Sequence, residues 1–166
     1  MTDKVYNVLF LCTGNSVRSL IAEALLNTMS KGRFKAYSAG SFPLGKVNPL
    51  AIELLARNGL ATEGLRSKGW DEFATPESPH MDLVITVCDN VAEGVCPIWP
   101  GHPVCGHWSF EDPAAVNGSD EQKREAFHKA YQEIAQRLHL LLSLSLESLD
   151  HLALQQKIRE IGRHPL

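Results

Sequence analysis

The sequence has little of several features that mark large classes of proteins. No apolar run approaches the roughly 20 residues that a membrane-spanning helix needs. Lys and Arg together number 16, against 19 Asp and Glu, which gives a net charge of -3. The chain therefore has no excess of cations with which to neutralise the phosphates of a nucleic acid. We expect neither a membrane nor DNA or RNA among its partners.

Cysteine is scarce, and a secretory signal is not evident. The first four residues lead into an apolar run that is too short for the core of a signal peptide and has no cleavage pattern after it. Without export, the four cysteines are expected to be thiols rather than a disulfide framework: Cys12, Cys88, Cys96 and Cys105. The sequence therefore predicts a cytoplasmic protein whose cysteines have catalytic or metal-binding roles.

Repeats, Pro-rich linkers and low-complexity runs are also lacking, so one compact domain is expected from 166 residues of which 44% are hydrophobic. Short apolar runs predict strands at residues 6–11, 34–38 and 82–87. Apolar residues at helical spacing, with capping residues before two of the segments, predict helices at residues 20–26, 49–58 and 119–142. This alternation predicts an α/β fold, a doubly wound parallel sheet of about four strands with helices on both faces.

A loop with the sequence CTGNSVRS, from Cys12 to Ser19, joins the first predicted strand to the first predicted helix. Backbone N–H groups in such a loop can point inward and hold a tetrahedral anion such as phosphate, arsenate or sulfate. The same groups and the helix dipole favour a thiolate at Cys12, which makes it a nucleophile. Arg18 can present a planar fork to two oxygens of the anion, a geometry that lysine does not reproduce.

The residues expected to bind the oxyanion are therefore those that follow the nucleophile: Thr13, Gly14, Asn15, Ser16, Val17, Arg18 and Ser19. Gly14 and Asn15 are residue types that tolerate the left-handed backbone conformation that a tight loop needs. Ser19 could add a hydrogen bond from its hydroxyl to the sulfur of Cys12.

Residues 11–19, with the sequence LCTGNSVRS, closely resemble the signature of the low-molecular-weight protein tyrosine phosphatase fold, and the resemblance covers roughly residues 5–143. It implies that Cys12 is the nucleophile and Arg18 the anion clamp. It also implies that Asp112, which precedes Pro113, is the general acid. A carboxylic acid there would protonate the departing oxygen.

The later cysteines make the chain similar to the arsenate-reductase branch of this fold, of the thioredoxin-coupled type. The similarity rests on residues 82–88, Cys96-Pro97, His107-Trp108 and residues 110–114. It implies that arsenate forms an adduct on Cys12, that Cys88 attacks the adduct and releases arsenite, and that Cys96 then accepts the disulfide. Cys105 could substitute for Cys96.

The resemblance also bears on cofactors and ions. No cofactor is expected to be tightly bound, because the electrons would come from thioredoxin, or from glutathione and glutaredoxin. Some relatives bind potassium beside the loop, and Asn15, Glu23 and Ser38 match three of its ligands, whereas Lys68 stands in the fourth position. An ammonium at Lys68 could occupy the place of the cation, so no bound metal is expected.

Other functions remain open. A phosphatase of the same fold needs only the nucleophile, the clamp and the acid. An oxyanion-binding module without turnover would need only the loop. A zinc site built from Cys88, Cys96 and Cys105, with His102 or His107, is a further alternative, although no close C-x-x-C pair supports it.

Two segments lie outside the strands and helices predicted so far. Residues 91–112 are rich in Pro, Gly, Cys and aromatic residues, which predicts a long functional loop. Residues 144–166 follow the phosphatase-like catalytic domain, residues 1–143, and form a predicted amphipathic helical extension. Its apolar residues are expected to cover the domain's own surface or to mediate a homodimer: Leu146, Leu149, Leu152, Ile158 and Ile161.

Overall fold

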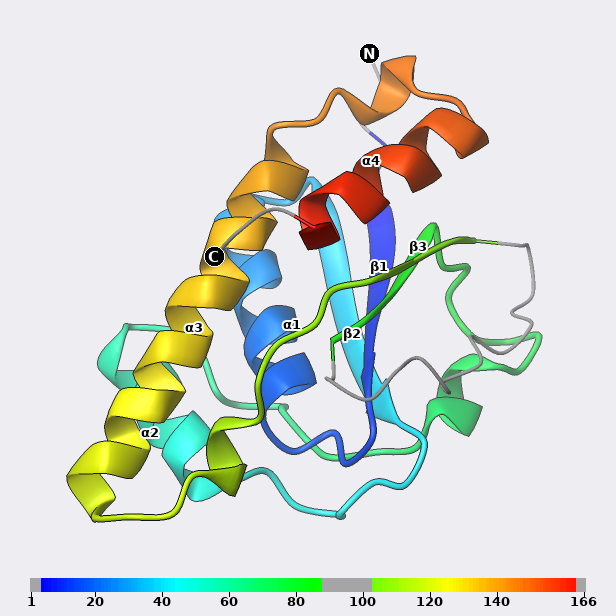
Figure 1. Cartoon of the computed structure of the whole chain (residues 1–166). Helices are drawn as coiled ribbons and strands as arrows, with labels where there is room; N and C mark the ends of the chain where they lie inside the picture. Colours follow the sequence, from blue (N-terminus) through cyan, green and yellow to red (C-terminus); the bar gives the residue numbers. More distant parts are fainter. Residues whose placement is uncertain (1–3, 88–102, 164–166) are drawn as a thin grey trace.

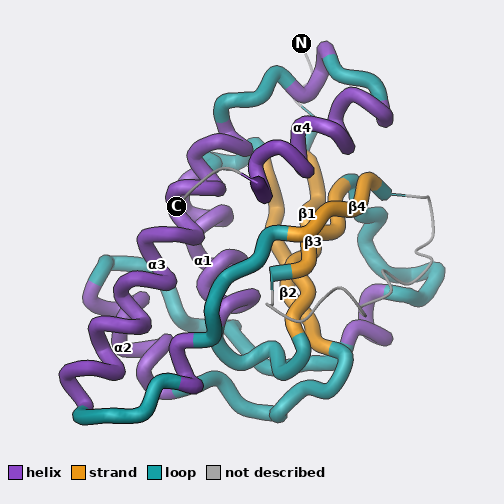
Figure 2. Tube along the Cα trace, in the orientation of Figure 1, coloured by secondary structure: helices purple, strands orange, loops and turns teal. Residues whose placement is uncertain are grey.

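The computed structural model describes residues 4–87 and 103–163. Four parallel strands form one sheet in the order β2-β1-β3-β4. The strands are β1 (Tyr6–Cys12), β2 (Phe34–Gly40), β3 (Leu83–Thr86) and β4 (Val104–His107). The chain first moves outward from β1 to β2 and then returns past β1 to β3 and β4, so the predicted doubly wound α/β fold is confirmed (Figures 1 and 2).

Helices surround this sheet. The α-helices are α1 (Arg18–Met29), α2 (Pro49–Arg57), α3 (Asp120–Leu142) and α4 (His151–Arg163). Short 3₁₀ helices occur at η1 (Trp70–Phe73), η3 (Pro113–Ala115) and η4 (Leu146–Ser148). In Figure 1, α1 lies against the sheet, and α2 and α3 lie outside α1. Helix α4 packs against the edge strand β4, which Figure 2 labels.

The two faces of the sheet are covered differently. Successive side chains of a strand point to opposite faces. Val8 and Phe10 therefore join a large core with α1, α2, α3 and α4, whereas Leu9 and Leu11 pack on the other face in a small cluster that includes Phe73 of η1. In the described part of the chain, helices thus pack on both faces of the sheet, as predicted. One face is covered by α-helices and the other by the 3₁₀ helix η1.

Two sequence-based expectations were wrong in detail. The segment 91–112 was expected to be a loop throughout, but β4 lies within it and pairs with β3. This edge strand was inconspicuous because its sequence VCGH contains a glycine and has no alternation of apolar and polar residues. In the C-terminal extension, Leu152 is 76% exposed and Leu154 is buried in its place.

The extension shares the core of the domain. Leu154, Ile158 and Ile161 of α4 are buried against β4 and α3. The backbone of α4 approaches β4 closely, because a Cβ atom added at Gly162 would lie 2.5 Å from the carbonyl oxygen of His107. The division of the chain at residue 143 stays a prediction, but this helix packs as part of the same body.

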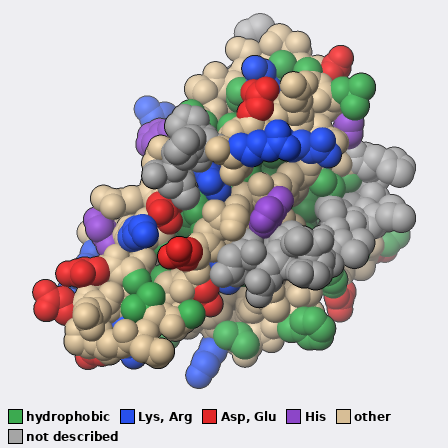
Figure 3. Space-filling view, viewed as in Figure 1, with side chains coloured by type: hydrophobic (Ala, Val, Ile, Leu, Met, Phe, Trp, Pro, Cys, Tyr) green, Lys and Arg blue, Asp and Glu red, His purple; other side chains and the backbone are tan. Residues whose placement is uncertain are grey.

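The surface agrees with a chain of low net charge. Acidic and basic side chains are interspersed over the face drawn in Figure 3, and no large area carries one sign. Among the described residues, no helix is both long enough and apolar enough to cross a bilayer.

Candidate active site

The loop between β1 and α1 is wrapped by the segment that follows β2. The backbone N–H groups of Phe42, Leu44 and Asn48 donate to the carbonyl oxygens of Thr13, Gly14 and Ser16, at 2.9 to 3.1 Å. In a trans peptide, the carbonyl of one residue and the N–H of the next point in opposite directions. The N–H groups that follow these three carbonyls therefore point away from the wrapping segment, into the loop. This is the arrangement that holds an oxyanion.

The start of helix α1 differs from the starts of α2 and α3. Helix α2 is capped by the side chain of Asn48, and α3 has a capping box formed by Ser119 and Gln122. By contrast, no side chain caps α1 at Val17, and no acidic residue lies in its first turn. An anion in the loop can therefore take the place of a cap and interact with the positive end of the helix dipole.

Asn15 closes the loop from inside. It is fully buried and has a φ of 46°, which is the left-handed conformation expected for it. Its side-chain amide donates to Ser19 Oγ at 2.8 Å, and its Oδ1 accepts from the backbone N–H of Lys68 at 2.8 Å. Of the two loop residues that tolerate this conformation, Asn15 adopts it and Gly14 does not. The bond from Ser19 to the Cys12 sulfur stays a prediction, for which the hydroxyl proton is still available.

Arg18 and Asp112 meet at the mouth of the loop. The guanidinium of Arg18, which is 8% exposed, donates from Nη1 to the carbonyl oxygen of Phe110 at 2.9 Å. Its Nη2 lies 3.7 Å from Asp112 Oδ2. The other carboxylate oxygen of Asp112 accepts from the N–H of Ala114 and caps η3. The clamp and the acid predicted 94 residues apart are thus neighbours, and the half-buried Asp112 can reach a group held by Arg18.

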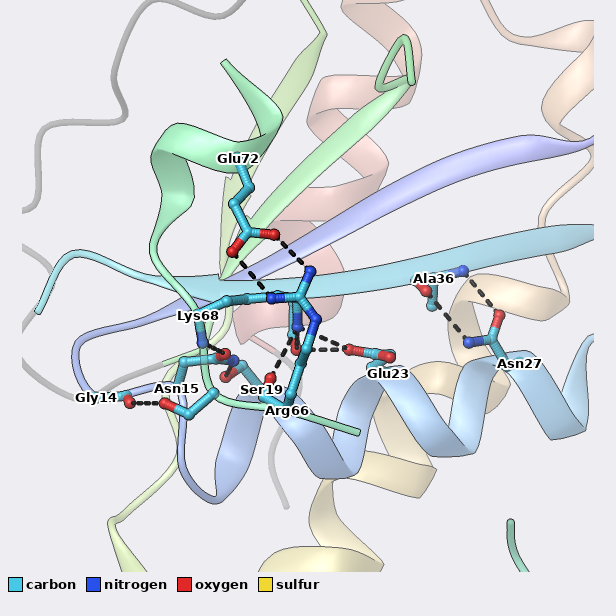
Figure 4. Close-up of polar contacts among 11 residues, drawn as sticks. Gly14, Asn15, Ser19, Glu23, Asn27, Ala36, Arg66, Lys68 and Glu72 are labelled. Carbon is cyan, nitrogen blue, oxygen red and sulfur yellow. Dashed lines mark hydrogen bonds and ion pairs between the residues drawn. The ribbon is translucent and has the colours of Figure 1, made fainter. Parts of the chain in front are cut away.

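Beside the loop, a second cluster joins the supporting residues (Figure 4). Ser38 Oγ donates to Glu23 Oε1 at 2.6 Å. Figure 4 shows Glu23 and Lys68 on adjoining elements beside the loop. Lys68 Nζ lies 3.4 Å from Ser38 Oγ and 3.7 Å from Glu23 Oε1, and it donates to the carbonyl oxygen of Arg66 at 3.0 Å. The ammonium therefore sits among oxygen acceptors, while the backbone of the same lysine holds Asn15.

Burial governs the charges of this cluster. It raises the pKa of Glu23 above its ordinary value, although Ser38 and Lys68 act in the opposite direction. It also lowers the pKa of Lys68, although Glu23 acts in the opposite direction. Each charge is thus disfavoured by its surroundings and depends on the other for compensation.

The cysteines are distributed unevenly. Cys12 is buried at the carboxyl end of β1, at the start of the loop. Cys105 lies on β4 beside Val84, two strands away from β1 and against the small cluster on the opposite face of the sheet. Cys88 and Cys96 lie outside the described residues, as does His102, so the zinc alternative is not tested. Among residues 4–87 and 103–163, no group of three His, Cys, Asp or Glu side chains could hold a metal ion.

Some residues of the site were not predicted. Ser67 donates from Oγ to the carbonyl of Gly14 at 3.1 Å, and nothing in its sequence context distinguishes it from other loop serines. Gly40, the last residue of β2, was not singled out either. A Cβ atom at residue 40 would clash with the carbonyl oxygen of Thr13. Only glycine, which has no Cβ, therefore lets β2 end against the loop. The sequence shows a glycine just after the predicted strand, but it does not show that this glycine lies against the loop.

Comparisons with known proteins agree with this geometry. An arsenate reductase of Bacillus subtilis (strain 168) is 36% identical over 138 residues, which cover 83% of this chain and 94% of that protein. The crystal structure of arsenate reductase from Archaeoglobus fulgidus superposes with a TM-score of 0.66 at 31% identity, over 82% of this chain and 99% of that one. A thioredoxin-dependent arsenate reductase of Corynebacterium glutamicum gives a TM-score of 0.60 at 29% identity, over 85% of this chain and 62% of that one.

The family to which these features point is shown by a match over most of the chain. The sequence model of the low molecular weight phosphotyrosine protein phosphatase family matches residues 7–156. This span contains the wrapped loop, Asp112 and the first half of α4. The chain therefore belongs to the low molecular weight phosphotyrosine protein phosphatase family.

Proposed function

We propose that the protein is an arsenate reductase that converts arsenate to arsenite through its cysteines. The observation that carries the proposal is the loop after Cys12, whose carbonyl groups accept hydrogen bonds from the wrapping segment, together with the contact between Arg18 and Asp112. We infer that the N–H groups of this loop face inward and bind the oxyanion. The 36% identity to a curated arsenate reductase over 94% of that relative supports the choice of arsenate within the family.

In the first step, the Cys12 thiolate attacks the arsenic atom of bound arsenate. A sulfur–arsenic bond forms, one arsenic–oxygen bond breaks, and the departing oxygen takes a proton from Asp112 and leaves as water. Arg18 and the loop N–H groups stabilise the oxygens on which charge accumulates. No electron has moved at this stage, so the adduct still contains arsenic(V).

The reduction needs a second thiol. We propose that the Cys88 thiolate attacks the sulfur of Cys12, so that a Cys12–Cys88 disulfide forms and the electron pair of the sulfur–arsenic bond goes to arsenic. Arsenite leaves as arsenic(III), with the proton that it needs coming from solvent. Cys96 would then attack Cys88 and release the Cys12 thiolate, and a dithiol of the thioredoxin type would reduce the Cys88–Cys96 disulfide.

The structure gives a reason why Cys105 would not take the place of Cys88 as the thiol that attacks Cys12. Strands of a sheet are about 4.8 Å apart, so β4 lies about 10 Å from β1, whereas disulfides join Cα atoms less than about 7 Å apart. Cys105 also faces the side of the sheet opposite to Cys12. A direct bond between them would require β4 to leave the sheet.

Thioredoxin is the reductant that we propose, because one structural relative is described as thioredoxin-dependent. Glutathione with glutaredoxin is the alternative. A thioredoxin-coupled enzyme would work in the cytoplasm, where thiols are kept reduced.

Phosphatase activity is a second candidate function, favoured by one observation. The contact between Arg18 and Asp112 completes the set that phosphate-ester hydrolysis needs, without any further cysteine. Because arsenate and phosphate have nearly the same shape, the loop cannot choose between them, and the later thiols decide which reaction dominates.

Arsenate-dependent oxidation of NADPH, coupled through thioredoxin and its reductase, tests the proposal. Cys12→Ser, Cys88→Ser and Cys96→Ser should each abolish turnover, and Cys105→Ser, as the matched control, should retain it. Hydrolysis of para-nitrophenyl phosphate should survive in every variant except Cys12→Ser. Hydrolysis without arsenate turnover, with either reductant system, would leave a phosphatase, and phosphate binding without either activity would leave a binding module.

A further inference from the structure

The segment Ser109–Asp112 carries two groups that contact Arg18, and it is itself contacted by an arginine of α3. Arg137 donates from Nη1 to the carbonyl oxygen of Ser109 at 2.9 Å. Its guanidinium carbon also lies 4.8 Å from the centre of the Phe110 ring. Arg137 is 5% exposed, and Phe110 is 2% exposed, so both contacts are shielded from water.

These contacts lead directly to the active site. Arg137 fixes the carbonyl of Ser109 and the ring of Phe110, and the carbonyl of Phe110 accepts the hydrogen bond from Arg18. Two residues later, Asp112 lies beside the other terminal nitrogen of Arg18. A shift of the backbone at Ser109 would therefore move the clamp and the acid together.

Packing alone does not explain why residue 137 is an arginine. The other buried positions of α3 hold apolar side chains: Phe127, Ala130, Ile134, Leu138 and Leu141. Burial lowers the pKa of Arg137, which reflects the cost of taking a cation out of water, although Glu133 partly offsets it. A methionine or leucine would fill the same space without that cost, so the charge and the planar fork need another reason.

We propose that Arg137 is a positioning residue for catalysis, which holds the segment Ser109–Asp112 so that Arg18 faces the oxyanion and Asp112 reaches the departing oxygen. The proposal rests on the function proposed above insofar as it assumes that Arg18 binds the anion and Asp112 protonates the leaving group. It does not depend on arsenate being the substrate.

The test compares Arg137→Met with Arg124→Met. The two variants remove an arginine from the same helix by the same substitution, but Arg124 pairs with the half-buried Glu53 rather than with the Ser109–Asp112 segment. For each variant, kcat and KM would be measured with phenyl phosphate, a poor leaving group, and with para-nitrophenyl phosphate, a good one. The Kd of inorganic phosphate, measured by calorimetry, reports on anion binding by Arg18 and the loop, without any need to protonate a leaving group.

We expect Arg137→Met to lower kcat with phenyl phosphate by roughly 10- to 100-fold. The decrease with the nitrophenyl ester should be much smaller, because a good leaving group depends less on protonation by Asp112. The Kd of phosphate should rise by about fivefold, since the clamp loses its alignment. Arg124→Met should match the wild type in both kcat values and in the Kd of phosphate. Arg137→Lys keeps the charge without the fork, so it should show smaller changes in the same direction.

A general loss of stability would lower the kcat values for both esters equally. Assays at temperatures well below the unfolding midpoint of each variant exclude this effect. An unchanged ratio of the two kcat values, together with an unchanged Kd for phosphate, would overturn the proposal. Should Arg137→Met not fold, Arg137→Lys takes its place under the same criteria. Should the wild type hydrolyse neither ester, the Kd of phosphate decides alone. Failure of arsenate turnover in wild type would refute only the proposed function, because none of these readouts involves arsenate reduction.

Discussion

At the residue scale, the close approach of Gly40 to Thr13 makes the oxyanion loop sensitive to one methyl group. Gly40→Ala would drive a Cβ into the carbonyl oxygens of Thr13 and Cys12, both of which are backbone atoms of the loop. We expect a loss of about 1–3 kcal/mol in the free energy of unfolding. Phosphate should also bind more weakly, because the loop has to shift. Urea unfolding and calorimetric titration with phosphate would measure both effects.

The matched control for this variant is Gly69→Ala. Gly69 pairs with Gly40 in an isolated bridge, but a Cβ at Gly69 would meet its nearest neighbour, Pro43, at an ordinary 3.8 Å. This control should bind phosphate like the wild type. Equal phosphate affinity in both variants would show that the loop tolerates the added methyl group.

The pair formed by Lys68 and Glu23 predicts a dependence on pH. Lys68→Met removes an influence that lowers the pKa of Glu23, so that pKa should rise further above its ordinary value. A carboxyl whose folded pKa is raised binds more protons in the folded state, and stability is therefore lost as pH rises through the folded pKa. The variant should be close to the wild type near pH 5 and less stable by about 3 kcal/mol near pH 8. Urea unfolding at the two pH values measures the difference.

A double substitution separates charge from packing in this cluster. Lys68→Met combined with Glu23→Gln removes both charges and should recover most of the stability at pH 8, with little change between pH 5 and pH 8. If Lys68→Met alone loses the same stability at both pH values, the role of Lys68 is one of packing, and the charge compensation inferred from Glu23 is incorrect.

At the scale of elements, the predictable parts were those whose pattern is local. The strand at Tyr6 and the capped helices at Asn48 and Ser119 could be predicted, because burial on both faces and capping each leave a signature within a few residues. The short edge strand β4 could not be predicted, since its residues Val104–His107 owe their extended conformation to pairing with β3 and to the helix packed on them. Tertiary contacts decided the conformation there.

Helix α4 and β4 therefore predict an energetic coupling. A Cβ at Gly106 would clash with Cγ2 of Ile158, so Gly106→Ala should lower the free energy of unfolding by about 1–3 kcal/mol. Ile158→Ala should cost about 2–5 kcal/mol through the cavity that it leaves. In the double variant, the new methyl group would occupy part of that cavity, so the loss should be smaller than the sum of the two by at least about 0.5 kcal/mol. A double-mutant cycle in urea measures this, and additive losses would mean that α4 moves to accommodate the methyl group.

At the scale of the whole molecule, the site could be predicted only where its residues share a motif. Cys12 and Arg18 lie in one loop and were found together, whereas Ser67 and Arg137 come to the site from distant parts of the chain. Their side-chain types are common on surfaces, and only the folded backbone gives them partners. Long-range placement of this kind leaves no period or spacing in a single sequence.

Because the loop is built from β1, α1 and the segment after β2, an oxyanion bound in it should stabilise the entire fold. A ligand that binds only the folded state at 100 times its Kd adds about 2.7 kcal/mol to the free energy of unfolding. For a domain of this size, that gain corresponds to a rise of roughly 5–10 °C in Tm.

We expect phosphate, arsenate and sulfate to produce such a rise, and sodium chloride at the same ionic strength to produce almost none. Arg18→Met, which removes the clamp, should lose most of the rise, whereas Arg124→Met should keep it. Thermal scans of the three proteins with and without each anion measure the effect, and an equal rise in Arg18→Met would place the anion outside the loop.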